Sequence, residues 1–185
     1  MILNKEDLKN YIEEDNWYYN KMFSKKDKLL LFLVRDPQYL IKKYKYHLRK
    51  EELFLNTPSK SHAIFRLYHL KKKNVLGNKL GILVPPNTFG KGLTIMHHGS
   101  IIVNPDARIG DYCILHGNNC IGNNGKTNAV PQIGNKLDLG IGACIIGDVK
   151  LGNGIIIGAN AVVNKSFNDN SVLLGVPAEL KNYYR

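Results

Sequence analysis

Aliphatic residues recur every six positions through the second half of the chain, from about residue 91 onward, and the next residue is often glycine. A helix repeats near 3.6 residues and a strand at two, so a period of six fits neither element alone. It is typical of a parallel β-helix built from hexapeptide repeats, in which each short strand is followed by a tight turn. The positions predicted to fill its core are Val103, Ile109, Leu115, Ile121, Ile133, Leu139, Ile145, Leu151, Ile157 and Val163.

The repeat lapses at two places, and each lapse predicts a local departure from the regular coil. Residues 123–132, "NNGKTNAVPQ", hold Thr127 where an aliphatic residue is expected, which predicts a loop that leaves the helix. The other lapse is His97. The loop closely follows His97 along the chain, so we interpret the loop as functional. The register would turn the His97 side chain inward unless the first coil is distorted.

The first half of the chain follows a helical pattern instead. Its first 76 residues contain no glycine, whereas 14 of the 17 glycines lie after residue 90. Asn4 is a predicted helix N-cap, and so is Asp36, which is followed by a proline suited to the first helical position. A third helix is expected over residues 61–75. We therefore divide the chain into a helical region, residues 1–84, and a β-helix domain, residues 85–185.

The charge of the chain is unevenly placed. Residues 1–90 hold 18 Lys and Arg against 9 Asp and Glu, a net charge of +9, while residues 91–185 hold 8 against 6, a net charge of +2. Solvated helix faces, attraction to an anionic cofactor and attraction to an anionic membrane surface all explain this excess. Nucleic acid is the weakest candidate partner, because no binding motif accompanies the charge.

The cysteines and the N-terminus bear on the cellular compartment. Cys113, Cys120 and Cys144 form no CxxC pair, which argues against a disulfide framework and a zinc ribbon. The N-terminus lacks the layout of a signal peptide, and the apolar run at residues 29–34 is too short to span a bilayer. We expect a cytoplasmic protein with reduced thiols.

Candidate chemistry gathers in three histidines. His97 and His98 interrupt the apolar run "TIMHHGSIIVN", and His116 stands in "ILHGNNCIG". His98 and His116 are 18 residues apart, the length of one coil of three hexads, so they are expected to stack on the outer face. Imidazole is the side chain best suited to take a proton from a hydroxyl near neutral pH.

The stretch "GLTIMHHGSIIVNPDARIGDYCILHGNNCIGNNG", the repeats after it and the closing "LLGVPAEL" resemble the hexapeptide-repeat acyltransferases. The similarity covers roughly residues 62–181. The Gly-Leu-x-Ile-x-His stretch at residues 92–97 is most similar to the serine acetyltransferase branch, with its sugar and capsular-polysaccharide O-acetyltransferases. The resemblance implies a mainly β protein with a left-handed parallel β-helix, a homotrimer, no metal, and acetyl-CoA bound between neighbouring subunits.

On this resemblance His97 is the catalytic general base, with His98 as the alternative base. His97 would take the proton of an acceptor hydroxyl as its oxygen attacks the thioester, while backbone N–H groups of the turns stabilise the oxyanion. No cysteine nucleophile is needed. His116 is expected to contact acceptor or cofactor. The remaining assigned residues are Met96 and Asn104 near the acceptor, and Gly142, Ala143, Ala161, Lys165 and Lys126 near acetyl-CoA.

Two departures from the serine enzymes bear on the acceptor. In those enzymes an aspartate that helps bind the amino acid precedes the catalytic histidine, and here that position is Met96. They also carry an arginine and a histidine before the proline that ends the loop, where this chain has Ala129 and Val130. Serine needs charged partners and a sugar hydroxyl does not. The favoured activity is O-acetylation of a sugar or surface-polysaccharide precursor, with serine O-acetyltransferase of cysteine synthesis as the alternative.

Two other classes of protein stay open. A metal-dependent hydratase of the γ-type carbonic anhydrase kind needs three histidine ligands, and no third ligand is apparent near His116. A non-enzymatic scaffold would not depend on His97. The N-terminal helices are expected to pack on one end of the β-helix in a simple trimer. Their charge could hold that trimer near an anionic membrane carrying a lipid-linked glycan.

Overall fold

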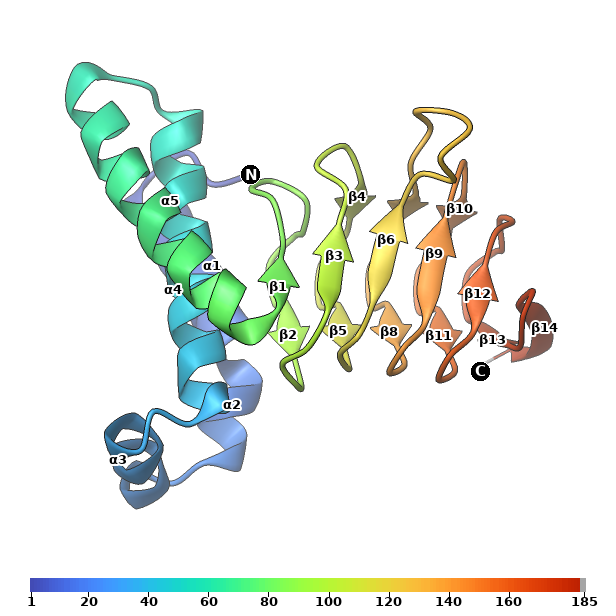
Figure 1. Ribbon diagram of the computed structural model, residues 1–185, viewed down its shortest axis with the longest axis horizontal. Helices are drawn as coiled ribbons and strands as arrows, with labels where there is room; N and C mark the ends of the chain where they lie inside the picture. The colour runs from blue at the N-terminus through green and yellow to red at the C-terminus, as the bar shows by residue number, and fades with distance from the viewer. Residues whose placement is uncertain (184–185) are drawn as a thin grey trace.

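A computed structural model describes residues 1–183 as five helices followed by a three-sided coil of short strands (Figure 1). The helices are α1 (Lys5–Asp15), α2 (Trp17–Met22), α3 (Lys25–Leu33), α4 (Pro37–Asn56) and α5 (Lys60–Leu80). The strands are β1 (Ile82–Leu83), β2 (Thr94–Ile95), β3 (Ile101–Val103), β4 (Arg108–Ile109), β5 (Ile114–Leu115), β6 (Cys120–Gly122), β7 (Gln132–Ile133), β8 (Asp138–Leu139), β9 (Cys144–Ile146), β10 (Lys150–Leu151), β11 (Ile156–Ile157), β12 (Val162–Val163), β13 (Ser171–Leu174) and β14 (Glu179–Tyr183). Among the described helices, none combines the length and apolarity needed to cross a membrane.

Three parallel sheets form the sides of the coil. Sheet A contains β1, β3, β6, β9 and β12, sheet B contains β4, β7 and β10, and sheet C contains β2, β5, β8, β11 and β13. Strand β14 turns back and pairs antiparallel with β13 at the end of sheet C. In Figure 1 the strands of sheet A run upward in front, the chain returns behind, and successive coils advance to the right, so the winding is left-handed.

The hexad positions fill the interior of this coil, as predicted. All ten aliphatic residues of the six-residue pattern are at most 6% exposed. Strand register stacks each on the equivalent residue of the next coil, so that Leu115 pairs with Leu139 and Leu139 with Ile157. Backbone ladders between coils satisfy the polar groups, and aliphatic side chains fill the space that remains. The predicted parallel β-helix is therefore confirmed.

The helical region agrees with its predicted caps and exceeds its predicted length. The Asn4 side chain accepts a hydrogen bond from the Asp7 amide, and Asp36 caps α4 in the same way. Helix α5 runs five residues past the predicted end at Val75 and stops at Gly81, whose φ of 72° is left-handed. Helix α3 was not predicted. More described residues lie in helices than in strands, so the prediction of a mainly β protein is wrong in its proportions.

The helices pack on the N-terminal end of the coil, as expected, and share its core. Leu40, Tyr44 and Leu48 of α4 belong to the same buried cluster as Leu93 and Ile95 of the first coil. Figure 1 shows α4 and α5 crossing this end, while the coil extends away from them. The first coil is therefore held between helices on one side and the second coil on the other.

Candidate functional site

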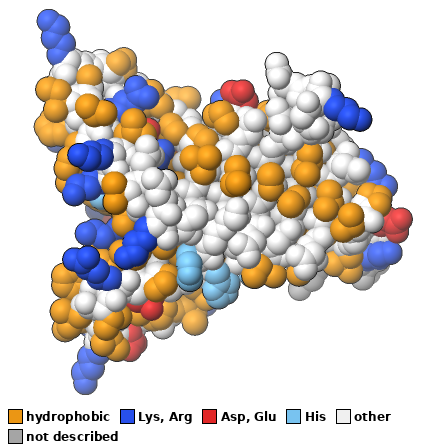
Figure 2. Space-filling view, in the orientation of Figure 1, with side chains coloured by type: hydrophobic (Ala, Val, Ile, Leu, Met, Phe, Trp, Pro, Cys, Tyr) orange, Lys and Arg blue, Asp and Glu red, His pale blue; other side chains and the backbone are white. Residues whose placement is uncertain are grey.

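All three predicted histidines lie at one corner of the coil, where the chain passes from sheet C to sheet A. We call it the histidine corner; it comprises residues 96–100, 116–119, 140–143 and 158–161 of successive coils. His97 and His98 are exposed between β2 and β3, and His116 is partly buried between β5 and β6. In Figure 2 the histidines form a single patch at the lower edge of sheet A, beside the helical region.

The histidines reach the surface because the first coil is two residues longer at this corner. Ile95 pairs with Leu115 and Val103 with Ile121. Eight positions therefore separate Ile95 from Val103, whereas six separate Leu115 from Ile121. Ile95 takes the core position, at 2% exposed, and the surplus residues bulge outward. This is the distortion that the sequence register required for His97 to face outward.

The same register corrects the expected stack of His98 on His116. Because Ile95 pairs with Leu115, the next position along the ladder brings Met96 beside His116. The Met96 amide donates to the Leu115 carbonyl at 2.9 Å, which fixes this alignment. The prediction that His98 and His116 stack one coil apart is therefore wrong, and the half-buried Met96 occupies that place.

His97 packs instead over Gly117, the residue that follows His116. A Cβ atom added to Gly117 would lie 3.4 Å from the His97 Cβ, and Gly117 has a φ of 115°. A side chain at this position would be strained by the backbone conformation. Glycine here lets the turn after His116 pack closely under the turn that carries His97.

His116 has a carboxylate partner that the sequence analysis missed. Its Nε2 lies 2.8 Å from Oδ1 of Asp138 in β8, with both side chains partly exposed. Since an ionised carboxylate only accepts, His116 donates through Nε2–H, and in the neutral imidazole Nδ1 then carries the lone pair. A signal was present in the sequence, because the residues that share the outward row of sheet C with Asp138 are Thr94, Ile114, Ile156 and Val172. Asp138 is the one charged residue in this row.

Helix α4 covers the open edge of the first coil. No further coil lies beyond β2, so the outward backbone groups of residues 84–96 need other partners. Helix α4 supplies most of them: Gln38 donates to the Met96 carbonyl, Tyr44 bonds both backbone groups of Val84, Lys45 donates to the Leu93 carbonyl, Arg49 donates to the Phe89 and Gly90 carbonyls, and Glu52 accepts from the Asn87 amide. The Gln38 contact fixes the peptide immediately before His97.

The charges in this cover are buried and paired. Arg49 is fully buried, with Nε 2.8 Å from Oδ2 of Asp15 and Nη1 3.0 Å from Oε2 of Glu52. Although burial acts to lower it, the pKa of Arg49 is held above its usual range by these two carboxylates. Burial lowers the pKa of Lys45 to about 8, against the opposing attraction of Asp15. Asp15 also accepts from the Leu93 amide at 2.9 Å, so the charges brace the strand that leads to His97.

The residues assigned to acetyl-CoA fall into two groups. Gly142, Ala143 and Ala161 lie on the histidine corner, on coils beyond the histidines. Ala143 and Ala161 are 0% and 1% exposed with side chains in the core, so they could meet a ligand through their backbone alone. Gly142 has a φ of 73°, and a Cβ there would lie 2.1 Å from the Asn160 side-chain oxygen. Glycine at position 142 therefore lets the Asn160 side chain of the next coil pack closely against this turn.

Asn104, Lys126 and Lys165 lie at the next corner, between sheets A and B. The Asn104 side chain is engaged in its own turn, where it accepts from the Asp106 amide at 2.9 Å. Lys126 lies in the predicted loop, which is confirmed as an exposed excursion between β6 and β7. Figure 1 places this loop at the opposite end of sheet A from the histidines. Within one chain, the structure does not bring these three residues to His97.

The face of sheet A between the two corners carries an apolar row, visible across Figure 2. Its outward residues, all at least partly exposed, are Leu83, Ile102, Cys120, Cys144, Ile146 and Val162.

Burial raises the pKa of Cys113 to about 12, which keeps that inward thiol protonated. Over residues 1–183, no three His, Cys, Asp or Glu side chains gather as a set that could hold a metal ion.

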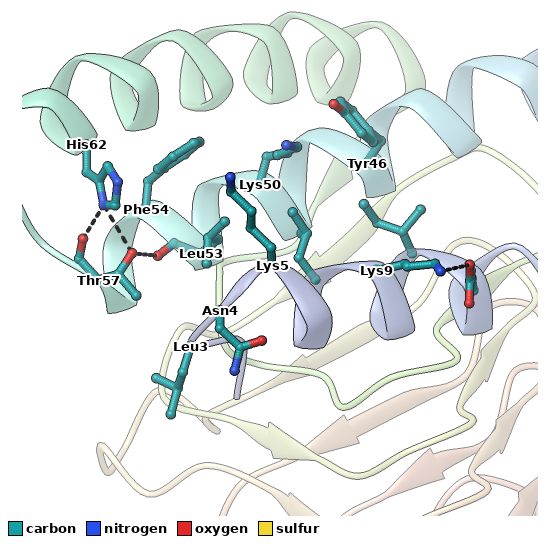
Figure 3. A pocket seen from close by; sticks show the side chains of 13 residues that line it. Leu3, Asn4, Lys5, Lys9, Tyr46, Lys50, Leu53, Phe54, Thr57 and His62 are labelled. Carbon is teal, nitrogen blue, oxygen red and sulfur yellow. Dashed lines mark hydrogen bonds and ion pairs between the residues drawn. The ribbon is translucent and has the colours of Figure 1, made fainter.

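A groove of about 710 Å³ lies apart from this corner, among α1, α4 and α5 (Figure 3). Leu8, Leu53 and Phe54 form an apolar floor, and Lys5 and Lys50 lie at its rim. All of its lining residues belong to the helical region, so the groove and the histidine corner are separate features.

No family model matches the chain. Over 96 residues it is 41% identical to the putative colanic acid biosynthesis acetyltransferase WcaB of Escherichia coli (strain K12), an alignment that covers 51% of this chain and 59% of WcaB. Over 103 residues it is 27% identical to a serine acetyltransferase of Synechococcus elongatus, covering 54% of this chain and 42% of that protein. The chain thus spans about half the length of these relatives.

Solved structures extend the similarity to the helices. Soybean serine acetyltransferase superposes on 96% of this chain and 70% of its own with a TM-score of 0.74 and 22% identity. A serine acetyltransferase in complex with CoA superposes with a TM-score of 0.68 and 19% identity, and the match covers 95% of this chain and 68% of its own. At these identities the structures establish the fold. With the sequence relatives, they confirm the resemblance to hexapeptide-repeat acyltransferases of the serine acetyltransferase-like branch.

Proposed function

We propose that this chain is an acetyl-CoA-dependent O-acetyltransferase that modifies a hydroxyl of a sugar or of a surface-polysaccharide precursor in the cytoplasm. The observation that carries the proposal is the enlarged first-coil turn, which presents His97 and His98 outward beside the His116–Asp138 pair. A regular coil would have buried an aliphatic residue there. The 41% identity to a protein named for polysaccharide biosynthesis supports the choice of acceptor.

His97 is the proposed general base. It takes the proton from the acceptor hydroxyl while the oxygen forms its bond to the acetyl carbonyl carbon. Bound acetyl-CoA supplies that carbonyl as a thioester, with sulfur as the leaving group. Backbone N–H groups of the corner turns face the negative charge that develops on the carbonyl oxygen. As the carbon–sulfur bond breaks, His97 returns the proton to the departing sulfur.

The His116–Asp138 pair positions the second imidazole. Asp138 accepts from Nε2–H of His116 at 2.8 Å and so fixes which ring nitrogen faces the neighbouring turn. The Nδ1 lone pair of His116 is then free to accept from the acceptor or from the amides of the bound donor. Met96, next to His116 in the register, contributes an apolar wall rather than a charge.

The histidine corner fits the extended arm of acetyl-CoA. Gly140, Gly142 and Gly158 are half-buried and add no side chain to the turns of successive coils, so a narrow chain can lie against their backbone. One fold relative was solved in complex with CoA. In the proposed homotrimer, the sheet A–sheet B corner of a neighbouring chain faces this arm. That arrangement brings Lys126 and Lys165, which lie far from His97 in their own chain, toward the phosphates.

Serine O-acetylation is the second candidate, supported by the serine acetyltransferases among both sequence and fold relatives. The acceptor side of this chain argues against it. Met96, Ala129 and Val130 offer no charge to the ammonium and carboxylate groups of serine.

The test is thiol release from acetyl-CoA by the full chain, with L-serine in one reaction and a panel of saccharides in the others. We expect release with a saccharide, and a loss of about 10²–10⁴-fold in His97→Ala. His62→Asn, at the separate groove, serves as the matched control and should retain activity. Thiol release with L-serine alone would show that serine, rather than a saccharide, is the acceptor. Full activity in His97→Ala together with loss in His98→Ala would move the base by one residue.

A further inference from the structure

Helix α3 exposes most of its apolar side chains. Five large side chains on α3 and the residue after it are at least half exposed: Leu29 59%, Leu30 58%, Phe32 50%, Leu33 65% and Val34 62%. No residue of α3 is buried. The contacts of the helix lie at its edges: the Phe32 ring packs against Tyr39 of α4 with centroids 5.3 Å apart, and Lys28 donates to the Asn20 carbonyl of α2. Surfaces of this kind on soluble proteins mark interaction sites.

Basic residues surround this apolar patch. Residues 21–35 contain Lys21, Lys25, Lys26, Lys28 and Arg35 against the single acid Asp27, a net charge of +4. The Asp27 carboxylate accepts from the Ser24 amide at 2.9 Å, so it is engaged in capping the helix. We call residues 21–35 the α3 surface.

We propose that the α3 surface binds the face of an anionic lipid bilayer. The apolar side chains enter the boundary between headgroups and acyl chains, and the lysines contact lipid phosphates. Charge decides between this occupant and a second copy of the chain. A two-fold contact between α3 surfaces would bring two sets of five cations together, whereas an anionic membrane neutralises them.

The place of the α3 surface connects it to the candidate site. Arg35 ends the surface, and three residues later Gln38 bonds the Met96 carbonyl that precedes His97. In Figure 1, α2 and α3 project from the end of α4 nearest the turn between β2 and β3. A bilayer bound here lies close to the histidine corner, which suits an acceptor saccharide carried on a lipid. This functional link rests on the proposed function, whereas lipid binding itself does not.

The test is co-sedimentation of the full chain with vesicles of phosphatidylcholine alone or mixed with phosphatidylglycerol, at low and at physiological salt. We expect binding to the mixed vesicles only, weakened by salt. The double variants Leu30→Gln/Leu33→Gln and Lys25→Glu/Lys26→Glu should each reduce the partition coefficient by about tenfold or more. Their thermal unfolding, read by circular dichroism, should match the parent because these side chains are exposed.

Helix α5 offers matched controls with the same change in charge and a similar change in exposed apolar surface. Ile64 and Leu67 are 72% and 65% exposed, and Lys71 and Lys72 are exposed as well. Ile64→Gln/Leu67→Gln and Lys71→Glu/Lys72→Glu should keep the parent partition coefficient. Equal losses in both sets would overturn the proposal, and so would absence of parent binding at low salt. Loss of self-association in the α3 variants, without vesicle binding by the parent, would assign the surface to a second copy. Vesicle binding without acetyl transfer would retain the membrane proposal and remove only the proposed function.

Discussion

The two halves of the molecule bury different chemistry. The interior of the β-helix is filled by aliphatic side chains repeated coil after coil. Every charged side chain that the structure buries within residues 1–183 lies in the helical half: Asp15, Lys45, Arg49, Glu51, Glu52 and Lys73. A coil satisfies most of its backbone groups through the coil beside it, and neutral side chains such as Asn119 bond others, so it buries no charge. The first coil has no neighbouring coil on one side, and there charged and amide side chains bond its backbone groups instead.

The contrast shows where specific chemistry is required in a repetitive fold. Residues 84–96 form the boundary, and side chains of α4 bond their outward backbone groups. The same segment leads into the histidine turn. Stability of this end and placement of His97 therefore depend on the same contacts, which the later coils do not make.

The largest expected effect comes from removing the central charge of the boundary. Arg49→Met removes the buried cation that bonds the carboxylates of both Asp15 and Glu52, and should lower the free energy of unfolding by about 3–5 kcal/mol. Urea unfolding followed by circular dichroism measures it. Arg66→Met on the exposed face of α5 is the control and should stay within about 0.5 kcal/mol of the parent. Equal values for the two variants would show that the buried charges are not needed to close the coil.

A core truncation in the β-helix should cost about as much as or slightly less than the Arg49 change. Leu139→Ala removes a fully buried side chain from β8 and is expected to lower the free energy of unfolding by about 2–5 kcal/mol. Because both halves share one core, unfolding should stay a single transition. Separate transitions for the two halves, seen by circular dichroism and by Trp17 fluorescence, would contradict that shared core.

Acid should weaken the helical half through a smaller effect at His47. Burial, together with the nearby His69, Lys43 and Lys72, lowers the pKa of His47 to about 4. Its ordinary value is about 6.5, so the unfolded chain takes up a proton that the folded chain refuses in this window. The stabilisation is complete above pH 6.5 and is lost as pH falls toward 4, a change of about 1–2 kcal/mol. His47→Gln should flatten this slope, and an unchanged slope would assign it to other groups.

The smallest expected change in stability is at Gln38, where the effect on catalysis should be larger. Gln38→Leu removes the hydrogen bond to the Met96 carbonyl and should lower the free energy of unfolding by about 1 kcal/mol. Because this peptide precedes His97, acetyl transfer should fall by about tenfold through kcat. Gln132→Leu, exposed on β7, is the matched control. Unaltered transfer in Gln38→Leu would mean that the histidine turn holds its own shape.

The parts predicted from sequence are those that local rules determine. A six-residue period identifies each core position independently, and Asn4 and Asp36 cap the helix that each begins. The shape of the turn at residues 96–100 could not be predicted in this way, because the extra length of the first coil is known only once Ile95 is paired with Leu115. Asp138 reaches His116 across a coil lengthened by the loop at residues 123–131. Helix α3 has no buried face, so the sequence holds no apolar periodicity that would predict it.

Strand β14 has a consequence for how the chain behaves at high concentration. It folds antiparallel over β13, while α4 blocks the outward groups at the other end of the coil. A stack of identical coils with free ends is a template for polymerisation, since each edge can pair with the opposite edge of another molecule. With both ends blocked by segments that run in other directions, the coil has a finite length. The same repeat that makes the interior so regular is thereby kept from growing into a filament.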